Sequence, residues 1–295
     1  MNDPDGVFRL DRARIRASFE RASAGYESAA GLQAQVSAEL LERLAAFGFE
    51  PRTVLDLGSG TGRVTRELKR RYPRALVIAL DLAPGMLREA RRHQHLWRRF
   101  ARVCGDGLRL PLRDASVDLV FSSLMLQWCE PLEVALAQVR RVLQSNGFFA
   151  FSTFGRDTLC ELRAAWAQAD DYNHVNHFPD VHELGDSVMR AGLTEPVLDV
   201  DRIEIGYADA LSLMRDLKAI GAHNVTAGRS RALAGRARLE RMQAAYESCR
   251  REDRLPATFE IIYGASWGAA GRQAAPAIGG VARIAPGSIR RAGRT

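Results

Sequence analysis

Short apolar runs alternate with amphipathic stretches through the first half of the chain. The apolar runs predict buried strands and the stretches between them predict helices, because their apolar residues recur at helical spacing. The predicted strands are 54–57, 75–80, 102–104, a run that starts at residue 117, and 148–154, and the predicted helices are 63–72, 84–92 and 132–143. Strands that alternate with helices predict a parallel sheet wound on both faces.

Helical periodicity also precedes the first strand. It runs through residues 19–41, and Val36, Leu40, Leu41 and Leu44 give this stretch an apolar face. We expect residues 1–50 to form a helical N-terminal segment ahead of the sheet, called the cover below.

The second half adds two strands separated by a long helical insertion. The strands are predicted over 196–205 and 258–263, and Leu211, Met214, Leu217 and Ile220 begin the helical spacing between them. An insertion of this length between pairing strands is usually functional. The expected fold is therefore α/β, with a seven-stranded, mostly parallel sheet and helices on both faces. The expected segments are the cover (1–50), the core (51–207 and 255–267), a helical lid between the last two strands (208–254) and a basic, largely flexible tail (268–295).

The first predicted strand ends in a glycine-rich turn at Gly58, Gly60 and Gly62. A dinucleotide fingerprint would need its third glycine at the position of Arg63, and a Walker-type loop would need a Gly-Lys pair that is absent here. Together with Asp56, the turn resembles the first motif of Rossmann-like, class I methyltransferases that bind S-adenosylmethionine.

Later acidic residues agree with that resemblance. Asp81 ends the second predicted strand, where a carboxylate can accept hydrogen bonds from both ribose hydroxyls. Asp106 follows the third strand, and in the methyltransferase pattern this acid faces the adenine amino group. Surface carboxylates at strand ends are the plainer alternative. The resemblance implies S-adenosylmethionine as cofactor, bound by Gln33, Asp56, Gly58, Gly60, Gly62, Asp81, Leu82, Asp106, Gly107 and Ser123.

The composition limits the class of protein and the compartment in which it works. The chain has 295 residues, of which 46% are hydrophobic, so it can bury a sizeable core. Its four cysteines form no C-x-x-C pair, which predicts neither a disulfide framework nor a zinc site and suits a reducing cytoplasm. No stretch approaches 18 uninterrupted apolar residues, so we expect no membrane span.

The net charge of +7 is unevenly distributed. Five arginines and no acidic residue occupy 268–295, and a second basic cluster holds Arg88, Arg91, Arg92, Arg98, Arg99 and Arg102. Such a cluster is either a solvated helix face or a docking surface for an acidic partner. Arginines of the predicted lid, such as Arg229, Arg231 and Arg236, are the alternative docking surface. Few aromatic residues are interleaved with the charges, so we expect no nucleic acid partner.

The second half carries a more specific resemblance. The segments 122–128, 151–154, 157–159, 174–178, 217–224, 255–260 and 263–267 resemble the malonyl-acyl carrier protein methyltransferases of biotin synthesis. This resemblance implies methyl esterification of the free malonyl carboxylate, on an acidic acyl carrier protein or on malonyl-coenzyme A, by a cytoplasmic monomer. Two alternatives stay open. One is an arginine hydroxylase resembling a respiratory complex I assembly factor, and the other is a methyltransferase for another small acid or a quinone.

Candidates for the acceptor site come from the cover, the core and the predicted lid. Tyr26, Trp128 and His174 are expected to line the approach, and Lys218, His223 and Asn224 are candidates to hold the malonyl carboxylate, for which a cation is expected. Core packing is the alternative for Tyr26, a solvated face for Lys218, and helix capping for His223 and Asn224. A carboxylate needs no strong general base, so no catalytic residue beyond positioning groups is expected. His174, His177, His182 and Asp180 have spacings that do not favour a metal site.

Overall fold

A seven-stranded sheet with the strand order β3-β2-β1-β4-β5-β7-β6 forms the centre of the protein. The structure is a computed structural model and describes residues 10–48, 50–222 and 235–268. The five strands from β3 to β5 are parallel, and β7 is antiparallel to both of its neighbours, β5 and β6. The strands are β1 (Thr53–Leu57), β2 (Leu76–Asp81), β3 (Ala101–Cys104), β4 (Val117–Ser123), β5 (Leu143–Phe154), β6 (Thr194–Tyr207) and β7 (Leu255–Trp267).

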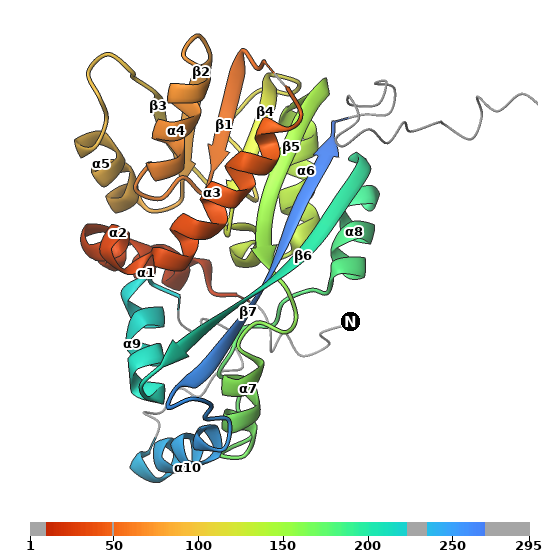
Figure 1. Ribbon diagram of the computed structural model, residues 1–295. Helices are drawn as coiled ribbons and strands as arrows, with labels where there is room; N and C mark the ends of the chain where they lie inside the picture. Colours follow the sequence, from red (N-terminus) through yellow and green to blue (C-terminus); the bar gives the residue numbers. More distant parts are fainter. Residues whose placement is uncertain (1–9, 49, 223–234, 269–295) are drawn as a thin grey trace, which may run out of the picture.

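Helices cover both faces of this sheet, as the alternation of elements predicts (Figure 1). One face holds α3 (Gly31–Ala45), α4 (Arg63–Arg71) and α5 (Pro84–Arg92), and the other holds α6 (Leu132–Val142) and α8 (Val181–Arg190). Successive strand residues point to opposite faces, so Val54 packs with the first group and Leu55 with the second. The predicted α/β class, with its mostly parallel sheet of seven strands, is confirmed.

The N-terminal segment lies across the carboxyl ends of the strands and is divided into several helices. These are α1 (Arg12–Ala22), a short 3-10 turn (Ser23–Gly25), α2 (Tyr26–Ala29) and then α3. The carboxylate of Glu20 accepts a hydrogen bond from the N–H of Gly85 at the start of α5 and pairs with Arg88. Since the first N–H groups of a helix have no partner within it, this contact fixes α1 to the core.

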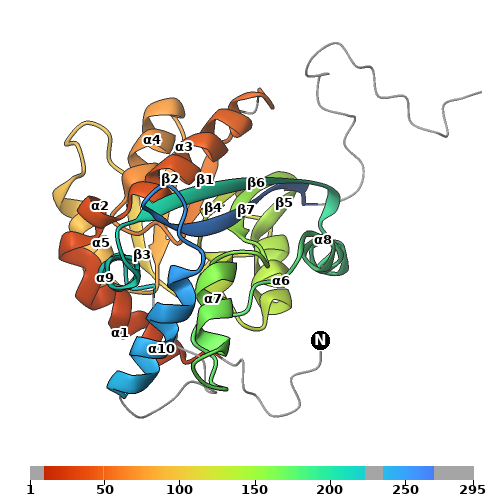
Figure 2. The ribbon, with the colours of Figure 1, turned by 60° about the horizontal axis from the view of Figure 1, so that its bottom comes forward.

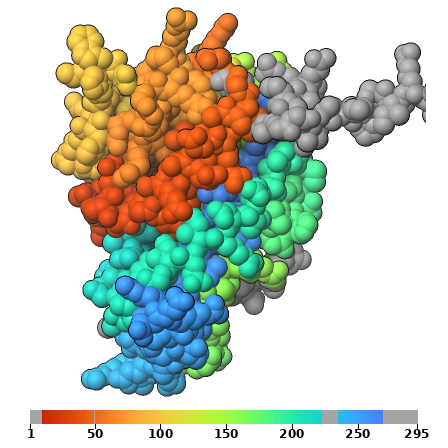
Figure 3. Space-filling model, in the orientation of Figure 1, coloured from red at the N-terminus to blue at the C-terminus, as the bar shows by residue number. Residues whose placement is uncertain are grey.

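The last two strands form a long ribbon that extends beyond the rest of the sheet (Figure 1). Three helices gather around its far end: α7 (Cys160–Ala167), α9 (Ala210–Ala219) and α10 (Arg236–Glu247). Figure 2 shows α7 beside α10, and α9 near α1 and α2. The edge strand β6 presents an exposed surface (Figure 3), whereas β7 is buried along nearly all of its length.

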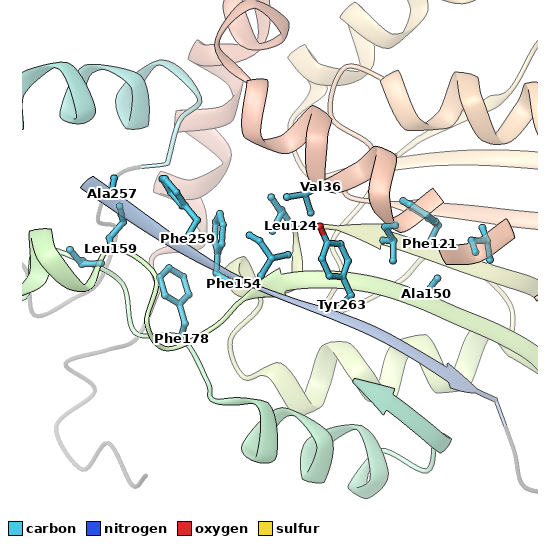
Figure 4. Close-up of a cluster of buried hydrophobic side chains, with 14 of the residues drawn as sticks. Val36, Phe121, Leu124, Ala150, Phe154, Leu159, Phe178, Ala257, Phe259 and Tyr263 are labelled. Atoms are coloured by element: carbon cyan, nitrogen blue, oxygen red, sulfur yellow. The ribbon is translucent and has the colours of Figure 1, made fainter. Parts of the chain in front are cut away.

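A continuous apolar cluster joins the sheet to the helices around the ribbon. Figure 4 shows side chains following β7 from Phe121 and Tyr263 to Phe154, Phe259 and Ala257. At the far end, the fully buried Tyr246 of α10 donates a hydrogen bond to the carbonyl of Pro256, at 2.7 Å.

The two helices α9 and α10 lie between β6 and β7 in the sequence, as the predicted insertion requires. The predicted tail and the candidates His223 and Asn224 lie outside the described residues. Within the ranges that the structure describes, no helix combines the length and apolar character needed to cross a bilayer.

Candidate active site

A first cavity opens where β1, β2, β3 and β4 end. Its volume is about 930 Å³ with its open mouth included, which lies in the range of small-molecule sites. Eight of the ten residues predicted to bind the cofactor line it: Gln33, Gly58, Gly60, Asp81, Leu82, Asp106, Gly107 and Ser123. Tyr26 and Trp128, predicted for the acceptor side, line it as well.

The three glycines of the turn have different surroundings. A Cβ at Gly58 would overlap the side chain of Met125, and a Cβ at Gly62 would lie 2.9 Å from the Cβ of Ala90 in α5. A Cβ at Gly60 would have only the Tyr26 ring within 4 Å, at 3.9 Å. Gly62 therefore serves the packing of α5 and does not line the first cavity, whereas Gly60 leaves space at the cavity wall for a ligand to approach the backbone.

Asp81 is held in place by main-chain donors. Its two carboxylate oxygens accept hydrogen bonds from the N–H of Gly60 and the N–H of Ala83, each at 2.8 Å. Burial raises the pKa of Asp81 to about 6, against the lowering effect of these N–H groups. The carboxylate is thus positioned at the cavity wall, mainly ionised at neutral pH, with lone pairs left to accept hydroxyl donors such as those of a ribose.

A side pocket adjoins the first cavity at the amino-terminal end of α4. It is lined by Asp56, Ser59 and Arg63, and it shares Tyr26 and Gln33 with the first cavity. Burial raises the pKa of Asp56 to about 7, although the Thr65 hydroxyl donates a hydrogen bond to it.

The hydroxyl of Ser59 in this side pocket is buried and has no hydrogen-bond partner among the described residues. A buried polar group without a partner calls for an explanation, and a polar ligand supplies one. A carboxylate, a hydroxyl and a helix start suit the ammonium and carboxylate groups of an amino acid. The residues of the first cavity and the side pocket therefore fit S-adenosylmethionine, whose methionyl end Asp56 could hold and whose ribose Asp81 could hold.

The sequence patterns gave no indication of Arg12. This residue lies at the start of α1, lines the first cavity and forms an ion pair with Asp106. Asp106 also accepts a hydrogen bond from the N–H of Leu108 at 2.8 Å. Periodicity could not single out Arg12, because it stands among several other arginines in an exposed helix.

A second cavity lies beyond Trp128, between α7, α9 and the ribbon. Its volume is about 1490 Å³ with its open mouth included, and its wall is largely apolar. Of the predicted acceptor-site residues, Trp128, His174 and Lys218 line it. The two cavities meet, because they share the lining residues Gln33, Gln127, Trp128, Phe154, Ile220 and Ala222.

His174 is fixed in the wall of the second cavity by two contacts. Its ring stacks on that of Trp166 with centroids 3.7 Å apart, and its Nε2 lies 2.7 Å from the carboxylate of Asp170. Burial acts to raise the pKa of Asp170, but hydrogen bonds from His174 and from the N–H of Tyr172 hold it below its ordinary value. Across the described residues, no group of three or more His, Cys, Asp or Glu side chains is arranged to hold a metal ion.

Known proteins resemble this chain in both fold and sequence. A Methyltransferase domain family model matches residues 55–151. A Bacillus halodurans protein assigned as a methyltransferase has a TM-score of 0.57 at 16% identity, covering 79% of this chain and 98% of that one. The YcgJ protein of Bacillus subtilis has a TM-score of 0.53 at 17% identity, covering 75% and 94%. At these identities the two structures support the fold alone.

Relatives found by sequence are much more similar to this chain than these two structures are. The malonyl-acyl-carrier protein O-methyltransferase of Laribacter hongkongensis is 49% identical over 90% of this chain and 92% of its own length. The protein of the same name from Methylovorus is 47% identical over 92% and 93%. The chain therefore belongs to the malonyl-acyl-carrier protein O-methyltransferase family and is a methyltransferase that uses S-adenosylmethionine as its methyl donor.

Proposed function

We propose that the protein transfers a methyl group to the free carboxylate of a malonyl thioester on an acyl carrier protein. The product is a malonyl methyl ester, which would enter the synthesis of pimelate and biotin. The observation that carries the proposal is the meeting of the two cavities at Gln33 and Trp128. A cofactor in the first cavity and a thioester in the second would bring their reacting groups together there.

Methyl transfer to a carboxylate does not require a strong general base. S-adenosylmethionine supplies a methyl group already activated by its attachment to a sulfonium. A malonyl carboxylate is ionised at neutral pH, so the protein need not remove a proton. Its task is to align the carboxylate oxygen with the methyl group and to exclude water. The apolar wall that includes Phe154 and Ile220 suits the second requirement.

We infer that residues 1–50 act as the cover and residues 208–254 as the lid of this site. The described helices of the lid form part of the wall of the second cavity: Met214, Leu217 and Lys218 of α9 line it. In α10, Met242 and Tyr246 are fully buried. This helix is thus an anchored support, and closure would involve α9.

Two basic clusters could receive the acidic carrier, and their positions favour one of them. Arg98 and Arg99 precede β3, whose other end leads to Asp106 in the first cavity. A strand rises about 3.3 Å per residue, so these arginines lie roughly 20 Å from the cavities, at the opposite end of the sheet. That distance argues against Arg98 and Arg99 as the docking surface, whereas Arg88 of α5 is already paired with Glu20.

The arginines of α10 lie beside the second cavity. Arg241 donates a hydrogen bond to the carbonyl of Ala169 at 2.9 Å, and Arg238 lies 3.8 Å from Asp170, which holds His174 in the cavity wall. We infer that the carrier docks here, with Arg236 at the exposed start of the helix. The other two lid arginines considered from the sequence, Arg229 and Arg231, lie outside the described residues.

We place this reaction in the cytoplasm and assign it to a monomer. All four cysteines are free, which suits a reducing compartment. The relatives do not favour the arginine hydroxylase or the quinone methyltransferase that the sequence left open.

The test is a methyl-transfer assay with labelled S-adenosylmethionine and malonyl-acyl carrier protein, with the product identified by mass spectrometry. We expect a malonyl methyl ester on the carrier and none on the acetyl form. A folded protein that binds the cofactor but forms no ester on malonyl-acyl carrier protein or malonyl-coenzyme A would overturn the proposal. Methylation of malonyl-coenzyme A alone would overturn the carrier assignment.

A further inference from the structure

Two hydrogen-bond donors stand unused where the two cavities meet. Gln33 lies in the first turn of α3, and Trp128 ends the 3-10 turn Leu126–Trp128. Neither the carboxamide of Gln33 nor the indole N–H of Trp128 forms a hydrogen bond with any other described residue. The Trp128 ring is nevertheless held in place, since it packs edge-on against Phe19 with centroids 5.3 Å apart.

A neighbouring glutamine, Gln127, differs from Gln33 because its side chain has hydrogen-bond partners within the protein. Gln127 also lines both cavities, but its side chain is engaged on both sides. It donates a hydrogen bond to the carbonyl of Leu124 at 2.7 Å and accepts one from the Thr153 hydroxyl at 3.3 Å. Gln127 is therefore part of the framework, whereas Gln33 and Trp128 present donors to whatever occupies the junction.

We propose that Gln33 and Trp128 form the acceptor-carboxylate site and donate hydrogen bonds to the malonyl carboxylate. This inference rests on the proposed function and names the groups that hold its substrate. Both donors bind the oxygen that is not methylated, which leaves a lone pair of the other oxygen facing the methyl group. The new O–C bond forms as the S–C bond breaks, the electron pair of that bond returns to sulfur, and no proton moves.

The reaction itself explains why neutral donors suit this position. A negative carboxylate and a positive sulfonium react to give a neutral ester and a neutral thioether, so charge disappears in the transition state. A lysine or arginine at the junction would stabilise the charged ground state more than the transition state, and such binding does not accelerate the chemical step. An amide and an indole orient the oxygen without neutralising it.

The described cationic candidates from the sequence lie away from the junction of the two cavities. Lys218 and His174 line the second cavity but not the first. They therefore face the body of the acyl chain or the cavity entrance rather than the junction. The sequence-based expectation that a cation holds the carboxylate stays a prediction, and we propose a pair of neutral donors nearer to the cofactor instead.

The proposed pair would also make the site selective for a malonyl group. An acetyl or butyryl thioester would leave both donors without the carboxylate that they are proposed to bind. Sites built to hydrogen-bond a substrate group discriminate strongly against analogues that lack it, because their own polar groups are then left unpaired. The same pair would select a short dicarboxylic acyl group over an ordinary fatty acyl group.

The test compares isosteric variants. Gln33→Met and Trp128→Phe remove the donors and keep most of the side-chain volume, while Gln33→Glu places a carboxylate against the acceptor. Gln35→Met is the matched control, because Gln35 lies in the same helix but is exposed and lines neither cavity. The measurements are kcat and KM for malonyl-acyl carrier protein, and cofactor affinity by calorimetry.

At saturating cofactor, hydrogen bonds to charged groups predict a loss of about ten- to a hundredfold in kcat/KM for Gln33→Met and for Trp128→Phe. Saturation is needed because Gln33 also lines the side pocket assigned to the methionyl end of the cofactor. Gln33→Glu should be worse than Gln33→Met and should recover partly at lower pH, which a structural role in packing would not produce. Losses no larger than that of Gln35→Met, or losses that arise only from weaker cofactor binding, would overturn the inference. A wild-type protein that forms no ester would instead refute the proposed function.

Discussion

The two cavities are built in different ways. The first is formed by turns at the ends of short, buried parallel strands, and main-chain groups of Gly60 and Ala83 fix its central carboxylate, Asp81. The second is formed by side chains from α3, α7, α9 and the long β6–β7 ribbon, with Phe259 and His174 in its wall. The cofactor side thus depends on local backbone geometry, and the acceptor side depends on the packing of distant segments.

Because the two cavities are built in different ways, specificity for the cofactor and specificity for the acceptor can change independently. Substitutions around the second cavity should change the acceptor while sparing the cofactor, because the shared residues are confined to the junction. One apolar cluster nevertheless runs from α3 through β4 and β5 to α10, so the two sides should fold as one unit (Figure 4).

The largest effect is expected for Phe259→Ala. Phe259 is 4% exposed and packs beside Phe154 at the wall of the second cavity. Removing a buried phenylalanine should lower the free energy of unfolding by about 3–5 kcal/mol. Denaturant unfolding followed by circular dichroism measures this loss, with Phe121→Ala in the sheet as the comparison. A separate early transition for the ribbon in either variant would contradict the shared core.

Asp81→Ala tests the cofactor side, at the first cavity. If Asp81 accepts one or two hydrogen bonds from the ribose, each contributes roughly 1.5–3 kcal/mol, so the cofactor dissociation constant should rise at least tenfold. The KM for the acceptor should not change. Calorimetric titration of folded Asp81→Ala measures the affinity, and Asp201→Ala, at an exposed position on β6, serves as the control. Unchanged affinity would remove Asp81 from the cofactor site.

The effect of pH on cofactor affinity should be smaller than the effect of Asp81→Ala, and its sign follows from the raised pKa of Asp81. The pKa of Asp81 is raised to about 6 by burial, and in the proposed site the ionised form would bind the ribose. Cofactor affinity should therefore fall below about pH 6, by up to about 1.4 kcal/mol for each pH unit. The stability of the unbound protein responds in the opposite direction. The contribution of Asp81 is complete below its unfolded pKa and is lost as the pH rises through about 6.

Calorimetry over this pH range, repeated with Asp81→Asn, checks the assignment. The variant should show a flatter profile. A profile as steep as that of the wild type would assign the titration to another group, of which Asp56, with its pKa raised to about 7, is the nearest candidate.

The smallest effect is expected at the docking surface. Arg236→Glu reverses a charge on α10 whose side chain is 93% exposed, and Arg98→Glu is the matched change in the other basic cluster. Exposed charge pairs contribute about 0.2–1 kcal/mol, so Arg236→Glu should raise the KM for malonyl-acyl carrier protein by a few fold. Malonyl-coenzyme A should be unaffected, and the effect should shrink with added salt. A larger effect of Arg98→Glu would move the carrier to the other cluster.

The sequence by itself determined the sheet, the order of its elements and most of the first cavity. Strand and helix periodicities are local, and Gly58, Gly60 and Asp81 follow consecutive strands of a parallel sheet, so their meeting at one edge follows from topology. The sequence also placed the helical insertion between β6 and β7 correctly. The role of Gly62 was not accessible in this way, because its packing against Ala90 depends on the position of α5.

Only the tertiary structure decided how the second cavity joins the first. Gln33, Trp128 and Phe154 come from a helix, a turn and a strand that are far apart in the sequence, and no local pattern records that they share a wall. The ion pair between Arg12 and Asp106 is of the same kind. A hydrogen-bond donor that lacks a partner within the protein is visible only after packing has assigned the partners of all the others, and the proposed acceptor site rests on two such donors.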